Sequence, residues 1–140
     1  MIKVVFDTVG FVRSLINPFS FWGRIIFQHA SSYQLIVSQE ILIEILEVLK
    51  RSHLTVKYQA LQDRNMNKIL RIIGQAKVVK LSKIQPVSRD PNDDKFLSTA
   101  KAAHAHYLVS ADKDLLDLKK YKEIKIIDAP TFLQILEKVE

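Results

Sequence analysis

The sequence contains no cysteine, only three glycines and four prolines, and no apolar run long enough to span a membrane. Without cysteine there can be neither disulfides nor thiolate metal sites, so stability must come from packing and any metal must bind oxygen or nitrogen. The content of 26% charged and 48% apolar residues is typical of an ordinary folded globule. The first residues lead directly to Asp7 and form neither a signal peptide nor a membrane span, so we expect a cytoplasmic protein that does not associate with membranes.

The chain of 140 residues has the length of about one domain, and we expect a single domain over residues 1–140. Its 21 lysines and arginines exceed its 15 aspartates and glutamates, which gives a net charge of +6. Such a surplus attracts polyanions, and nucleic acid is the first partner to consider. Lysines on solvated helix faces would account for the same charge, so charge alone does not decide the question.

Strand-like runs alternate with helix-like segments along the whole chain. The run at 2–6 is almost continuously apolar, is rich in β-branched residues and ends at Asp7, as buried parallel strands do. This alternation predicts a three-layer α/β/α domain around a parallel sheet of four or five strands. The further strands are predicted at 35–37, 78–81, 107–109 and 124–127, and the helices at 11–16, 21–30, 38–51, 56–73, 90–105, 111–121 and 130–139.

Four carboxylates, Asp7, Glu44, Asp94 and Asp112, each lie just beyond a strand-like run or on the helix that follows one. The carboxyl ends of parallel strands converge on one crevice, so we expect the four to share a site. Two carboxylates about 5 Å apart repel each other by roughly 3 kcal/mol at an effective dielectric of about 20. Either some of them are protonated or a cation lies among them, and Mg²⁺ or Mn²⁺ is the usual cation in phosphate chemistry. The pattern therefore predicts a metal-dependent phosphodiesterase, and a nuclease first.

Each of these acids also has a structural alternative. Asp7 and Asp112 would cap the helices that follow them, and Glu44 would be an ordinary solvated glutamate on the rim of its helix. Asp90 and Asp93 would be used at the start of the next helix, which would leave Asp94 without a structural role. Four strand-end acids at one sheet edge exceed what capping requires, which favours the shared site.

Other side chains give weaker signals. The histidines lack the i, i+4 spacing of a zinc site, so surface or packing roles are expected for them. Phe19, Phe21 and Trp22 form an aromatic cluster, for which core packing or a partner surface is favoured over stacking on nucleic-acid bases.

Four segments together carry a family resemblance that extends over almost the whole chain. They are VVFDT at 4–8, VSQEILIEILEVL at 37–49, RDPNDDKFLSTA at 89–100 and YLVSADKDLL at 107–116. In these segments the chain resembles the PIN domain family, in particular its branch of toxin components of toxin–antitoxin systems, the VapC-like ribonucleases. The resemblance places the acids of the family on Asp7, Glu44, Asp94 and Asp112, with Asp93 as an alternative third member.

The resemblance implies a Mg²⁺- or Mn²⁺-dependent endoribonuclease that acts on single-stranded RNA. Asp7 and Asp94 would be the central metal ligands, and Asp112 and Glu44 would complete the pocket directly or through water. It also implies an antitoxin protein as a partner, and a second copy of the chain as another.

Three further positions bear on this resemblance. Thr8 and Ser110 match residues that the family keeps beside its site, whereas Val9 stands where the family usually has asparagine. Loss of that amide would weaken the orientation of the metal ligands. An alternative is therefore a PIN-like domain with weakened catalysis that serves as an RNA- or protein-binding module. Val9 also excludes an aspartyl-phosphate enzyme, which would need a second acid at that position.

Overall fold

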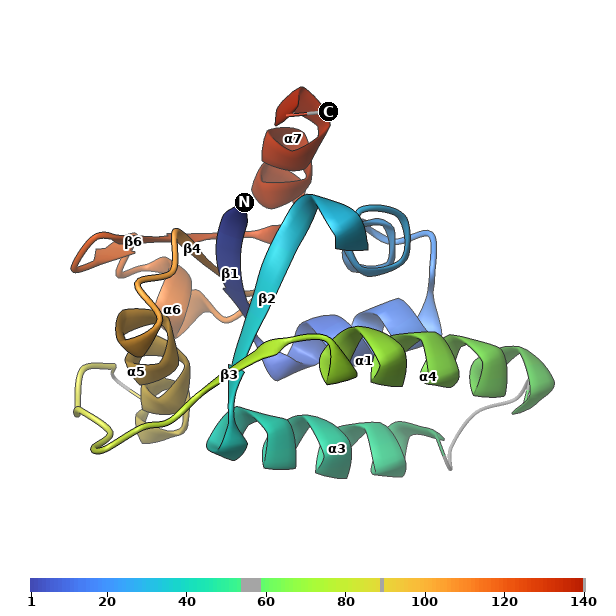
Figure 1. Cartoon of the computed structure of the whole chain (residues 1–140), viewed down its shortest axis with the longest axis horizontal. Helices are drawn as coiled ribbons and strands as arrows, with labels where there is room; N and C mark the ends of the chain where they lie inside the picture. Colours follow the sequence, from blue (N-terminus) through green and yellow to red (C-terminus); the bar gives the residue numbers. More distant parts are fainter. Residues whose placement is uncertain (54–58, 89, 140) are drawn as a thin grey trace.

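The computed structural model describes residues 1–53, 59–88 and 90–139 (Figure 1). Six strands form one sheet in the order β3-β2-β1-β4-β6-β5. They are β1 (Ile2–Phe6), β2 (Tyr33–Ser38), β3 (Lys77–Val79), β4 (Tyr107–Val109), β5 (Lys120–Tyr121) and β6 (Ile124–Ile127). The first four and β6 are parallel, which confirms the predicted parallel sheet, and the short β5 adds an antiparallel edge to β6.

The strand β5 lies where the sequence predicted a helix from 111 to 121. Only Lys113–Leu116 is helical there, and Lys119 and Lys122 have positive φ angles of 60° and 54°. Left-handed residues cannot continue a right-handed helix. The chain therefore turns back after Leu116 and pairs with β6, and this antiparallel pair was not predicted.

Helical elements separate the successive parallel strands, as predicted. They are α1 (Thr8–Ile16), α2 (Phe21–Gly23), the π-helical turn η1 (Arg24–Gln28), the 3₁₀ turn η2 (Ala30–Ser32), α3 (Gln39–His53), α4 (Gln59–Gly74), the 3₁₀ turn η3 (Pro91–Asp93), α5 (Asp94–Ala102), α6 (Lys113–Leu116) and α7 (Ala129–Val139). The predicted helix 21–30 is thus an α-helical turn, a π turn and part of a 3₁₀ turn. The predicted beginning of the fourth helix, at 56, lies outside the described residues.

Helices cover both faces of the sheet, which confirms the three-layer architecture. On one face α5 packs against β1, β2 and β4. On the other face the fully buried ring of Phe6 contacts an aromatic cluster at centroid distances of 5.3–5.9 Å. The cluster consists of Phe11 of α1, Trp22 of α2, Tyr33 of β2 and Phe132 of α7. Figure 1 shows α3 and α4 side by side on one flank of this body. No described helix is both long enough and apolar enough to cross a lipid bilayer.

Candidate active site

A pocket of about 360 Å³ opens at the carboxyl ends of the central strands β1 and β4. Acidic residues from four elements of the chain meet in its wall, together with one arginine and several apolar side chains. The lining residues are Asp7, Thr8, Val9, Arg13, Glu44, Val48, Asn92, Asp93, Phe96, Ala111 and Asp112. Three of the four acids that strand-end placement selected, Asp7, Glu44 and Asp112, therefore lie in one pocket.

Asp7 is fixed at the end of β1 by a set of short hydrogen bonds. Its backbone N–H donates to the carbonyl of Val109 at 2.9 Å, its Oδ1 accepts from the N–H of Val9 at 3.3 Å and its Oδ2 accepts from the hydroxyl of Ser110 at 2.8 Å. Burial raises the pKa of Asp7 above its usual value, while the hydrogen bonds from Ser110 and Val9 oppose that shift. The nearby charges of Asp112 and Glu44 raise this pKa further.

Ser110 connects two of the acids. Its hydroxyl is completely buried, donates to Asp7 and accepts the backbone N–H of Asp112 at 2.9 Å. Asp112 in turn caps α6, because its Oδ1 accepts from the N–H of Asp114 at 2.9 Å. The capping alternatives for Asp7 and Asp112 are thus realised, and both residues line the pocket as well.

The neighbouring acids Asp93 and Asp94 have the opposite roles to those that the capping argument assigned. Asp94 does not line the pocket, and its Oδ1 accepts from the backbone N–H groups of Val87 and Ser88 at 3.1 and 2.6 Å. Asp93 makes no capping hydrogen bond and lies in the pocket wall. The physical reason is that Pro91–Asp93 forms a 3₁₀ turn, which rotates these residues relative to the continuous α-helix that the sequence suggested.

Asp93 has the most perturbed environment in the pocket. Burial, a hydrogen bond with Asp112 and the charges of Asp112, Asp90 and Asp7 together raise its pKa to about 7. Its Oδ2 is buried, and no donor among the described residues bonds to it. Carboxylate oxygens of Asp90, Asp93 and Asp112 all lie within 4.8 Å of one another. This close approach of carboxylates is the source of the raised pKa of Asp93.

Glu44 lies at the other side of the pocket and already has partners from the protein. Its Oε2 accepts from the hydroxyl of Thr8, and its Oε1 lies 2.7 Å from Nζ of Lys95. Both side chains of the ion pair are partly buried. The charge of Glu44 is therefore balanced within the protein, whereas the charges of Asp7, Asp90, Asp93 and Asp112 face one another.

Sequence reasoning missed three residues of this site. Lys95 lies in the segment 89–100 but was not assigned a role, and Arg13 lies outside the four segments, although it follows Val9 by one helical turn on α1 and so shares its face. Asp90 was considered only as a cap, which it is, since its Oδ1 accepts from the N–H of Asn92 at 3.0 Å. The spacing of Asp90 and Asp93, three residues apart, was the available signal that both would lie near Asp112.

The donor set fits a hard divalent cation. All candidate ligands are carboxylate oxygens, which Mg²⁺ and Mn²⁺ prefer. The buried Oδ2 of Asp93 without a donor is the kind of orphan atom that a cation would satisfy. Asp7, Asp93 and Asp112 line the pocket, and a carboxylate oxygen of Asp90 lies within 4.8 Å of oxygens of Asp93 and Asp112, so these four acids are the carboxylates available to a cation.

Comparison with known proteins agrees with this geometry. The sequence pattern of the PIN domain family matches residues 3–114. The chain is 32% identical over 153 aligned positions to the uncharacterized protein MJ1680 of Methanocaldococcus jannaschii, covering 99% of this chain and 92% of that protein.

Two solved structures share the fold. PAE2754 from Pyrobaculum aerophilum superposes with a TM-score of 0.62 at 19% identity, covering 98% of this chain and 90% of that one. VapBC2 from Rickettsia felis, solved bound to a DNA fragment from its promoter, superposes with a TM-score of 0.58 at 13% identity, covering 91% and 98%. On the family match over residues 3–114 and the relationship to MJ1680, the chain belongs to the PIN domain family.

Proposed function

We propose that this protein is a Mg²⁺- or Mn²⁺-dependent endoribonuclease that hydrolyses phosphodiester bonds of single-stranded RNA. The observation that carries the proposal is the acidic pocket, in which the buried Oδ2 of Asp93 has no donor among the described residues and faces a cluster of like charges. Membership of the PIN domain family supports nuclease chemistry at that pocket. The net charge of +6 supports a polyanionic substrate.

In this proposal Asp93, Asp112 and Asp7 hold the cation, with Asp90 beside them. Asp94 has a structural role instead, because its Oδ1 accepts the backbone N–H groups of Val87 and Ser88 and so fixes the connection before η3. When bound, a divalent cation supplies activation of water for in-line attack and neutralisation of charge on the departing oxygen.

The remaining polar residues prepare the ligands. Ser110 holds Oδ2 of Asp7 and the backbone of Asp112 in one arrangement, so both carboxylates are oriented before any ligand arrives. Thr8 and Lys95 hold Glu44 at the opposite wall. The proton that Asp93 retains near neutral pH has to leave when the cation binds, so affinity for the metal rises as the pH rises through about 7.

We further propose that the protein is the toxin of a toxin–antitoxin pair, with an antitoxin protein as partner and a second copy of the chain as another. The fold shared with VapBC2 supports this assignment. Exposed apolar side chains on the paired helices α3 and α4 offer a surface for a protein partner, since Ile43, Leu46 and Leu70 are 52%, 44% and 41% exposed.

One observation favours a second function, a PIN-like binding module with weakened catalysis. Val9 lines the pocket with an exposed apolar side chain where the family usually has asparagine, so the pocket lacks that amide. Such a module would bind RNA or protein without cleaving RNA.

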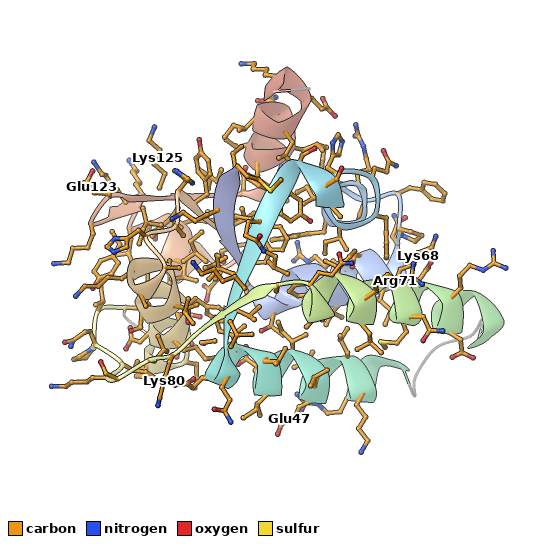
Figure 2. The ribbon with its side chains drawn as sticks, viewed as in Figure 1. Glu47, Lys68, Arg71, Lys80, Glu123 and Lys125 are labelled. Atoms are coloured by element: carbon orange, nitrogen blue, oxygen red, sulfur yellow. The ribbon has the colours of Figure 1, made fainter. Side chains whose placement is uncertain are left out.

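Calorimetric titration with Mn²⁺, followed by incubation with labelled single-stranded RNA, tests the proposal. We expect metal binding and metal-dependent cleavage by the parent chain, and loss of both in Asp93→Asn. The control is Glu123→Gln, which removes one carboxylate at the β5–β6 turn (Figure 2) and should leave both unchanged. If neither the parent chain nor Val9→Asn cleaves RNA in Mn²⁺, the binding module replaces the nuclease.

A further inference from the structure

A second pocket, of about 230 Å³, adjoins the acidic pocket. Arg13 and Ala111 line both pockets, and Ser110, whose hydroxyl donates to Asp7, also lines the second one. The second pocket is lined by Arg13, Ser20, Phe21, Trp22, Ser110, Ala111, Asp128, Ala129 and Pro130. We propose that it is a nucleobase subsite that receives an amino-bearing base, guanine, adenine or cytosine, of the RNA strand whose phosphodiester lies at the acidic pocket. This inference rests on the proposed ribonuclease function and names a determinant of its specificity.

Arg13 is placed to hold the phosphate between the two pockets. Its side chain is exposed on α1, and within the described residues no hydrogen bond or ion pair engages its guanidinium. A guanidinium presents five N–H donors in a planar fork that matches phosphate oxygens. Arg13 lines both the acidic pocket and the largely apolar second pocket. It can therefore bind a phosphate at their boundary while the attached nucleobase enters the second pocket.

Phe21 supplies a face for stacking. Trp22 is 3% exposed and packs edge-on against Phe6, whereas Phe21 is 51% exposed although it lines the pocket. The aromatic cluster, for which the sequence favoured core packing or a partner surface, is therefore divided between the core and the surface. The ring of Trp22 packs directly against Gly10, where an added Cβ would approach it to 2.4 Å.

Asp128 gives the pocket its selectivity. Its Oδ1 accepts the N–H of Thr131 at 3.0 Å at the beginning of α7, and within the described part of the chain no other hydrogen bond occupies its carboxylate. An ionised carboxylate only accepts hydrogen bonds, so it favours bases that carry an exocyclic amino group. Uracil presents carbonyl oxygens on both sides of its single N–H, and these repel a carboxylate.

Trp22, the only tryptophan of the chain, allows the subsite to be tested without cleavage. GMP and UMP are titrated separately into the protein in EDTA, and the fluorescence of Trp22 is followed. We expect GMP to bind at least about 5-fold more tightly than UMP. Phe21→Ala should weaken binding of GMP by about 5-fold or more, the usual loss when an aromatic stacking partner is removed. Arg13→Gln should weaken both nucleotides equally.

Asp128→Asn is the decisive variant, because asparagine still accepts the N–H of Thr131 but offers UMP a donor as well. It should reduce the preference for GMP to less than about 2-fold. The matched controls are Phe19→Ala, two residues from Phe21 but outside the pocket, together with Arg71→Gln on α4 and Glu123→Gln at the β5–β6 turn (Figure 2). These should bind as the parent does.

Cleavage of RNA oligonucleotides that differ at one base separates the two proposals. If the parent cleaves RNA in Mn²⁺ but Phe21→Ala and Asp128→Asn change neither nucleotide binding nor base preference, the subsite is wrong and the nuclease stands. If the parent does not cleave, yet GMP binds with the expected dependence on Phe21 and Asp128, the subsite stands and the nuclease fails. Absence of any GMP-dependent change in Trp22 fluorescence overturns the subsite.

Discussion

At the scale of single residues, the adjacent carboxylates of Asp93 and Asp94 show how position along a turn decides chemistry. Asp94 accepts hydrogen bonds from two backbone N–H groups, which fix the connection before η3. Among the described residues no donor bonds to Oδ2 of Asp93, and its carboxyl lies among other acids. Both residues are aspartates, so residue type does not distinguish them. The sequence therefore predicts that an acid of this turn lies in the pocket, but it does not show whether that acid is Asp93 or Asp94.

The stability of the metal-free protein should depend on Asp93 and pH. Its pKa of about 7 in the fold exceeds the usual 3.8, so folding favours the protonated form. That stabilisation is complete below about pH 4 and is lost as the pH rises through about 7. In EDTA, the melting temperature of the parent should therefore fall between pH 5 and 8 relative to Asp93→Asn, by roughly 3–5 °C for a change on the order of 1 kcal/mol. Parallel melting curves over this range would contradict the raised pKa.

Asp94 gives the complementary result. Asp94→Ala leaves the N–H groups of Val87 and Ser88 without their acceptor, which should lower the free energy of unfolding by about 2–3 kcal/mol in urea denaturation. Affinity for Mn²⁺ in the folded variant should change far less than in Asp93→Asn. If Asp94→Ala lost more affinity for Mn²⁺ than Asp93→Asn, Asp94 rather than Asp93 would be the metal ligand.

At the scale of elements, the sequence predicted the strands that deliver the site. The apolar run Ile2–Phe6 and the acid that ends it are local signals, and β1 is the central parallel strand with Asp7 at its carboxyl end. The sequence did not predict the hairpin of β5 and β6. Its left-handed residues, Lys119 and Lys122, are lysines, whereas glycine is the residue type that indicates a positive φ angle. The ion pair of Glu44 and Lys95 was also missed, since its partners are far apart in the sequence and meet only in the fold.

The packing contact between α1 and α2 gives a prediction at the scale of elements. Gly10 on α1 lies under the ring of Trp22 on α2, and a Cβ there would be 2.4 Å from the ring. Gly10→Ala should lower the free energy of unfolding by about 1–3 kcal/mol, the usual cost of overpacking, despite the better helix propensity of alanine. Gly74→Ala is the control, because within the described residues no atom outside its own stretch of helix lies within 4 Å of its Cβ position. Equal changes in the free energy of unfolding for the two variants, measured by urea denaturation, would show that the contact between Gly10 and Trp22 is not tightly packed.

At the scale of the whole molecule, the chain combines a net charge of +6 with a concentration of acids in one pocket. In the proposed function the basic residues attract the phosphate backbone of RNA, and the acids bind next to it only when a cation offsets their charge. Attraction and cleavage therefore depend on different residues and should respond differently to salt, metal and mutation.

Removal of one pocket charge should separate the two properties. Asp93→Asn removes a ligand for the cation but adds one unit to the net charge wherever Asp93 is ionised, so it should abolish Mn²⁺-dependent cleavage while RNA binding in EDTA stays equal or becomes tighter. Binding is measured by fluorescence anisotropy of labelled single-stranded RNA at increasing salt, where affinity should fall linearly on logarithmic axes for parent and variant alike. The exposed change Glu123→Gln adds the same charge far from the pocket and serves as the control for net charge. If Asp93→Asn instead weakens RNA binding in EDTA while Glu123→Gln does not, Asp93 contacts RNA directly, and its assignment as a metal ligand is wrong.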